Sequence, residues 1–225
     1  MIKEPLLKEL WTKAISIEFH RLAQGCPGVT KGTNTIFYLD HAEILSIPKD
    51  RTVTYGRIVI DHRPQKEDPN RVRITVGGNL IKYPFELTTR TANMLSSKIM
   101  WNSVISTLGA RFAGANIKNM YLKTPLDRYE YMRMPLDLFP DNIVNHYNLK
   151  RKAKNGFVYM EIRQGMYGLP QAGILVNKLL KKWLALHGYF EQPHTPGLWK
   201  HVSCPVWVNL CVNDFGIKNI EIKNL

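Results

Sequence analysis

The sequence predicts an α+β fold in which antiparallel strand pairs combine with amphipathic helices. Strand-like runs rich in β-branched residues occur in pairs separated by turn-forming residues, as in Tyr55–Ile60 and Arg71–Val76. Other segments carry apolar residues at helical spacing, as in Leu6–Leu22 and Ile174–His187. With 225 residues, 44% of them hydrophobic, the chain is long enough for one large domain or two interleaved subdomains.

The charge balance indicates a polyanionic partner. Lys and Arg total 31 against 18 Asp and Glu, a formal net charge of +13. Such an excess draws a protein toward nucleic acid, which is the first partner to consider. The alternative is a generally basic surface without a specific partner.

The cysteines and the hydropathy indicate an intracellular protein, in the cytoplasm or the nucleus. Cys26, Cys204 and Cys211 are odd in number and lack C-x-x-C spacing, which favours neither a disulfide framework nor a zinc site. The sequence has no apolar run of about 18 residues and no signal-peptide pattern at its start, so we expect neither membrane insertion nor secretion.

The first half of the chain predicts one helix and then several strands. Leu6–Leu22 reads as an amphipathic helix with Gly25 beyond its end, and Thr35–Leu39 reads as a short strand after a turn-rich segment. Tyr55–Ile60 and Arg71–Val76 then form an antiparallel pair, with alternate residues of the second strand on opposite faces. One face gathers basic side chains that suit phosphate or a solvated surface: Arg57, Arg63, Lys66, Arg71 and Arg73.

The middle of the chain predicts a helix, a strand and an irregular segment. Thr91–Leu108 fits a buried helix ended by Gly109, and Arg111–Tyr121 begins as a strand with a polar Asn116 inside it. Thr124–Pro140 has three prolines and is predicted to be irregular. The basic run Lys150–Lys154 is interpreted as a solvated loop, with nuclear targeting or RNA contact as the alternative.

The last third predicts a tight turn, a helix and a hairpin. Phe157–Arg163 is strand-like, and Gln164–Gly173 is a glycine-rich turn ahead of the helix Ile174–His187, whose start suits an anion. Val206–Ile217 consists of two apolar runs that meet at Asn213 and Asp214. A polar pair at such a tip is how a polymerase presents metal ligands.

Four blocks, in order, resemble the reverse transcriptase of copia-type LTR retrotransposons. They are Arg71–Gly77 (RVRITVG), Ala115–Leu122 (ANIKNMYL), Met166–Ala172 (MYGLPQA) and Cys211–Phe215 (CVNDF). The family has ARLVAKG, D-x-x-N-x-[FY]-L, LYGLKQA and VDD at the corresponding places. The resemblance runs from about Tyr55 to the end of the sequence.

The resemblance implies a right-hand polymerase with fingers and palm, the palm being an antiparallel sheet with helices packed on one face. Residues 1–54 would form an N-terminal helix and a lead-in to the fingers. The fingers would cover about 55–97 and 124–164, and the palm about 101–123 and 165–225. The thumb would be absent, so we expect a fragment truncated at its C-terminus.

The resemblance also implies RNA-directed DNA polymerase activity with two Mg²⁺ ions held by carboxylates. The carboxylates would stand at Asn116, Asn213 and Asp214, and of these three only Asp214 is acidic. We therefore expect Mg²⁺ binding to be weak or absent and catalysis to be lost. The alternatives are a non-catalytic nucleic-acid-binding remnant and a pseudogene product without function.

The remaining implied roles concern a primer–template of RNA or DNA and a deoxynucleoside triphosphate. Tyr121 would lie under the incoming sugar, Gln171 would contact the nucleotide near a helix start, and Arg71 and Arg73 would face its triphosphate. Tyr121 as a core aromatic residue and Gln171 as a helix cap are the structural alternatives.

Overall fold

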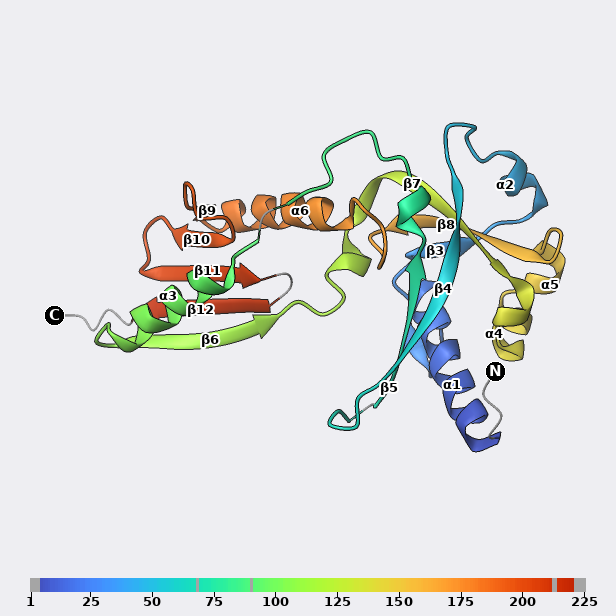
Figure 1. Ribbon diagram of the computed structural model, residues 1–225, viewed down its shortest axis with the longest axis horizontal. Coiled ribbons are helices and arrows are strands. Elements are labelled where there is room, and N and C mark those ends of the chain that lie inside the picture. The colour runs from blue at the N-terminus through green and yellow to red at the C-terminus, as the bar shows by residue number, and fades with distance from the viewer. Residues whose placement is uncertain (1–4, 68, 90, 212–213, 221–225) are drawn as a thin grey trace. The chain divides into compact units, whose positions relative to one another are not determined.

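The computed structural model describes residues 5–67, 69–89, 91–211 and 214–220 (Figure 1), and the chain divides into two compact units. The first unit contains Met1–Leu87 and Tyr121–Leu175, and the second contains Thr88–Met120 and Val176–Leu225. Each unit is therefore built from two separate stretches of sequence. The described residues contain six α-helices and several sheets, which confirms the α+β class.

The first unit is a five-stranded mixed sheet with helices and a small hairpin. Its strand order is β3-β8-β7-β4-β5, and all neighbours are antiparallel except β4 and β7, which are parallel. Its elements are α1 (Pro5–Leu22), β1 (Gly25–Cys26), β2 (Thr30–Lys31), β3 (Ile36–Tyr38), α2 (His41–Leu45), β4 (Val53–His62), β5 (Asn70–Val76), β7 (Pro125–Pro135), α4 (Asp141–His146), α5 (Leu149–Lys152) and β8 (Phe157–Gln164).

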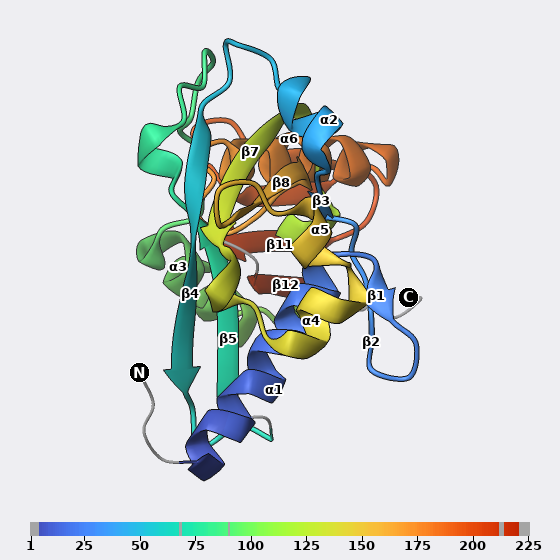
Figure 2. The same cartoon turned by 90° about the vertical axis from the view of Figure 1, so that its right-hand side faces the viewer.

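The core of the first unit follows the predicted helix and strand patterns. Strands β4 and β5 form a long antiparallel ribbon (Figure 2), and α1 packs against β5. As predicted, Val72, Ile74 and Val76 on one face of β5 are buried. Fully burying side chains of this size stabilises the fold by about 1.5–3 kcal/mol each.

The prediction that Thr124–Pro140 is irregular was wrong. Its residues from Pro125 to Pro135 form β7, which pairs with both β8 and β4. The two prolines stand at the ends of the strand and the third, Pro140, precedes α4, so the middle of the ladder loses no N–H donor. Similarly, residues 150–152 of the basic run Lys150–Lys154, which was interpreted as a loop, belong to the short helix α5 (Leu149–Lys152), in which Leu149 is fully buried.

The second unit is a five-stranded antiparallel sheet in the order β6-β12-β11-β10-β9. Its elements are α3 (Met94–Ile105), β6 (Ala110–Asn116), β9 (Tyr189–Glu191), β10 (Leu198–His201), β11 (Val206–Cys211) and β12 (Asp214–Ile220), together with residues 176–186 of α6 (Ala172–Leu186). Strands β11 and β12 confirm the hairpin predicted for Val206–Ile217. An ion pair of 2.6 Å joins Lys181 of α6 to Glu191 of β9.

The prediction that the helix within Thr91–Leu108 is buried was wrong. In α3, Met100 is the buried residue, whereas the side chains of Leu95 and Ile105 are 64% and 84% exposed. Besides Met100 and a ring contact between Trp101 and Phe112 of β6, polar groups join the helix to its sheet. Ser97 donates to Asn209 of β11 at 3.1 Å, and the buried Lys218 of β12 donates to Ser103 and Thr107.

Candidate functional site

Two of the predicted metal positions lie directly opposite each other in the second unit. Strands β6 and β12 pair Asn116 with Asp214 in register. The amide Nδ2 of Asn116 donates a hydrogen bond of 2.7 Å to Oδ1 of Asp214, and both side chains are exposed. The sheet thus brings together two positions 98 residues apart in sequence. The third position, Asn213, lies outside the described residues.

This pair does not fit a two-magnesium site. Mg²⁺ is held by carboxylates and needs near-octahedral oxygen ligands. Two facing carboxylates would repel each other and be relieved by a cation, whereas an amide satisfies its neighbour with its own N–H. Of the two predicted metal positions that the structure describes, Asp214 is the one with a carboxylate, and its Oδ1 already accepts from Asn116. The direct contact thus replaces the repulsion that a cation would relieve between two carboxylates.

In the first unit, two side chains, Arg73 and Tyr121, lie against Tyr167. The guanidinium of Arg73 lies 5.0 Å from the centre of the Tyr167 ring, and the ring of Tyr121 lies 6.4 Å from it. Within the described residues, the buried Nε of Arg73 has no hydrogen-bond partner. Burial, and then the neighbouring Tyr167, raises the pKa of Tyr121. Two predicted substrate residues, Arg73 and Tyr121, are thus brought to one place.

A close backbone contact holds Tyr167 there. The N–H of Val76, at the end of β5, donates to the carbonyl of Tyr167 at 2.8 Å. Gly168 follows with a φ of +93°, and a Cβ at this position would lie 2.2 Å from the carbonyl oxygen of Val76. Only glycine permits this approach, which explains why the turn is rich in that residue. Tyr167 was missed as a site residue although it lies within the MYGLPQA block.

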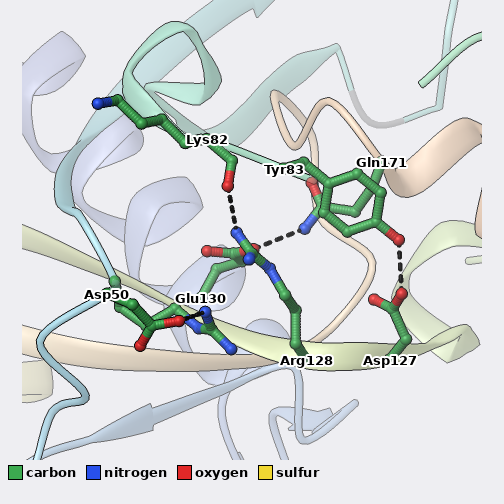
Figure 3. A network of polar contacts seen from close by, with 8 residues as sticks. Asp50, Lys82, Tyr83, Asp127, Arg128, Glu130 and Gln171 are labelled. Carbon is green, nitrogen blue, oxygen red and sulfur yellow. Dashed lines mark hydrogen bonds and ion pairs between the residues drawn. The ribbon is translucent and has the colours of Figure 1, made fainter. Parts of the chain in front are cut away.

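Gln171 belongs to a buried polar network rather than to the surface (Figure 3). Its Nε2 donates to Oε1 of Glu130 at 3.0 Å, and Arg128 donates to the same oxygen at 2.8 Å. The other end of the Arg128 guanidinium donates to the carbonyl of Lys82 at 2.7 Å. The backbone carbonyl of Gln171 accepts from Leu175 at the start of α6, so only its backbone takes the predicted capping position.

The network leaves one polar atom without a partner. Within the described chain, Oε1 of Gln171 is buried and has no hydrogen-bond partner. Arg128 and Glu130 were missed by the sequence analysis because β7 was predicted to be irregular. The signal that could have revealed them is that they fall at every second position with Leu126 and Met132, as residues on one face of a strand do.

Arg71 lies in a different environment from Arg73. It lines a groove of about 760 Å³ together with α1 residues, among them Glu18 and Arg21. Burial raises the pKa of Glu18, and the positive charges of Arg21 and, more weakly, Arg71 oppose that shift. Arg71 therefore contributes to the field around a buried acid as well as to the basic face of β5.

Comparisons with protein-family models and with curated proteins found no match to this chain. Among the described helices, none has the length and apolar character needed to cross a bilayer. The functional argument consequently depends on the residues themselves.

Proposed function

We propose that the chain is a copia-type reverse transcriptase domain that has lost nucleotidyl transfer. In this proposal the first unit corresponds largely to the fingers and the second to the palm. The supporting observation is the contact between Asn116 and Asp214. Two blocks chosen only for their resemblance to metal-binding segments lie on adjacent strands, at residues that pair directly.

The loss of activity follows from the charges at these positions. Joining a nucleotide to a primer needs two Mg²⁺ ions about 3.5–4 Å apart, which carry four positive charges between them. Asn116 and Asn213 each remove one negative charge from the ligand set. Every 1.36 kcal/mol of lost transition-state stabilisation slows a reaction about tenfold, so losing several kcal/mol at each position abolishes the chemistry.

Primer extension tests the proposal. The native chain, with an RNA template, a DNA primer and Mg²⁺ or Mn²⁺, should give no extended product. The doubly repaired variant Asn116→Asp/Asn213→Asp should bind Mn²⁺ at least tenfold more tightly by calorimetry, because carboxylates replace amides. Extension by the repaired variant alone would strengthen the proposal.

The matched control is Asn102→Asp/Asn219→Asp, which adds the same charge at exposed positions of α3 and β12. It should change neither Mn²⁺ affinity nor extension. Robust synthesis by the native chain would refute the proposal, as would equal Mn²⁺ binding by the repaired and control variants.

A second candidate function is binding of nucleic acid without catalysis. It is favoured by the +13 charge and by the grouping of Arg73 with two tyrosine rings, since cations and aromatic faces together suit a nucleic-acid strand. Fluorescence anisotropy with a labelled primer–template should show affinity that falls steeply with salt.

For this candidate, Arg71→Gln/Arg73→Gln should weaken binding and reduce the slope of log affinity against log salt by about 2, one for each lost phosphate contact. The control Lys31→Gln/Lys49→Gln removes equal charge from exposed positions elsewhere in the first unit. If both double variants weaken binding equally, the basic face of β5 has no special part in it.

A further inference from the structure

Three potential metal ligands converge in the first unit, away from the positions considered above. His20 comes from α1, Cys26 from β1 and His146 from the C-terminal end of α4. One ligand atom from each lies within 4.8 Å of the other two. His20 is buried, Cys26 is partly buried and His146 is exposed, so the cluster has a closed side and an open side.

A hydrogen bond to Tyr147 orients the ring of His20. The hydroxyl of Tyr147 donates its single proton to the carbonyl of Gly25 at 3.2 Å. The hydroxyl also lies 3.0 Å from Nδ1 of His20. With its proton directed to Gly25, Tyr147 accepts from Nδ1 of His20, and in that tautomer Nε2 keeps a free lone pair. Metal-binding histidines are commonly oriented in this way.

The two histidine rings of the cluster lie against each other. The rings of His20 and His146 stand edge to face with centres 4.8 Å apart.

The open side of the cluster leads to a groove. The groove has a volume of about 680 Å³ and contains all three ligand residues, with Glu9, Ser16 and Asn142 among its polar lining. A metal ion held by three side chains would thus keep one position directed toward this space. Three protein ligands with an open fourth position are typical of zinc sites that bind water or another small ligand.

We propose that His20, Cys26 and His146 bind a transition-metal ion, with Zn²⁺ as the natural occupant of this nitrogen and sulfur ligand set. Zinc bonds of about 2.0–2.3 Å place neighbouring ligand atoms about 3.3–3.7 Å apart, so ligand atoms separated by as much as 4.8 Å must approach each other on binding. The exposed His146 and the two-residue strand that carries Cys26 allow this movement. The bound ion ties α1, β1 and α4 together and does not depend on the polymerase proposal.

The test uses the untagged full chain after treatment with a chelator. Titration with Co²⁺ should give a thiolate-to-cobalt charge-transfer band and visible ligand-field bands that saturate at one ion per chain, and Zn²⁺ should abolish them by competition. Cys26→Ser should remove the charge-transfer band. Cys204→Ser/Cys211→Ser, which changes the two exposed cysteines, should leave it intact.

A second readout separates binding from folding. Zn²⁺ at about 100 times its dissociation constant should stabilise the native chain about 100-fold against unfolding, which appears as a raised Tm. His146→Gln, at an exposed position, should fold normally and lose this shift, whereas the exposed control His187→Gln should keep it. The proposal is overturned if Co²⁺ in excess gives no bands, if Cys26→Ser keeps the charge-transfer band, or if both histidine variants respond equally to Zn²⁺.

Discussion

At the scale of single residues, the buried carboxylate of Glu130 has one partner nearby in sequence and one far along the chain. Glu130 is 1% exposed, yet its carboxylate accepts from both Arg128 and Gln171. A buried acid is tolerated when its charge is paired and hydrogen-bonded in this way. Gln171, which was expected to contact a nucleotide, therefore donates to an interior carboxylate.

Removing Glu130 should be costly. Glu130→Ala leaves the Arg128 guanidinium and the Gln171 amide without their shared acceptor, and breaking a buried ion pair costs about 3–5 kcal/mol. Urea denaturation should show this loss in the free energy of unfolding. Asp137→Ala, at an exposed position, should change it by no more than about 0.5 kcal/mol. Equal effects would mean that the network contributes nothing specific.

Tyr83 should lose its proton at an unusually high pH because of its surroundings. Partial burial, and then its hydrogen bond of 2.5 Å to Asp127, raises the pKa of Tyr83 to about 12. A pKa raised in the folded state favours the protonated phenol, so the associated stability is present below pH 10 and is lost as pH rises through 12.

The phenolate absorbance measures this shift. Asp127→Asn should lower the pKa of Tyr83 toward 10 without reaching it, because burial remains. To isolate the absorbance change of Tyr83, the titration is repeated with Tyr83→Phe added to the native chain and to Asp127→Asn, and each curve is subtracted from its parent. An unchanged titration in Asp127→Asn would show that the carboxylate does not act on this tyrosine.

At the scale of elements, α3 differs from an ordinary amphipathic helix. Most of its large apolar side chains face solvent, and its attachment to the sheet combines Met100 with polar contacts from Ser97 and Ser103. Gly216 of β12 leaves the space that Met100 occupies, since a Cβ there would lie 2.8 Å from the Met100 methyl group.

Substitutions on α3 should therefore affect the free energy of unfolding very differently at exposed and at buried positions. Leu95→Lys/Ile105→Lys should leave the free energy of unfolding within about 1 kcal/mol of the native value, at no more than about 0.5 kcal/mol per surface change, and should raise solubility. Met100→Lys on the same helix should destabilise by about 3 kcal/mol or more, because it buries a charge. Circular dichroism during denaturation distinguishes the two. Comparable losses would mean that the exposed face is covered in the native protein.

Sequence patterns predicted the elements whose burial follows a simple period. The alternation along β5 is an example, because its buried residues share one face. The helix α1 lies where it was predicted, but Leu7 and Leu10 on its apolar side are exposed. The patterns failed where partners come from far away in sequence. Nothing near α3 reveals that its polar face meets Asn209 and Lys218, and the prolines around β7 concealed a strand.

The candidate sites show the same limit. The pairing of positions 116 and 214 agrees with the expectation that both supply one site, but the hydrogen bond between them required the register of β6 and β12. The cysteine spacing indicated no metal site, because the ligands that accompany Cys26 are histidines on two other elements.

At the scale of the whole molecule, each unit has its own buried side chains. The first unit has a continuous core that includes Phe19, Ile74 and Met160. The second buries Trp199, Val208 and Leu210 within its sheet. Local cores of this kind allow regions of one chain to open at different free energies.

Trp199→Ala should reveal this division. Removing a tryptophan that is 1% exposed costs about 3–5 kcal/mol. Hydrogen exchange should then speed up in β9 to β12 while the amides of β7 and β8 remain protected. The converse variant, Ile162→Ala, should expose β7 and β8 first. Uniform loss of protection in both variants would show that the units open together.

The parallel pairing of β4 with β7 delays completion of the sheet during protein synthesis. Val53 of β4 pairs with Tyr131 of β7, and the stretch from Thr88 to Met120 is made between them although it belongs to the other unit. At about 5–20 residues per second, a ribosome takes roughly 4–16 seconds to deliver β7 after β4. During that interval the edge of β4 that pairs with β7 has no partner strand. A two-stranded ribbon such as β4–β5 is marginally stable alone. The nascent chain therefore passes through a stage in which the unpaired strand edge is accessible to chaperones.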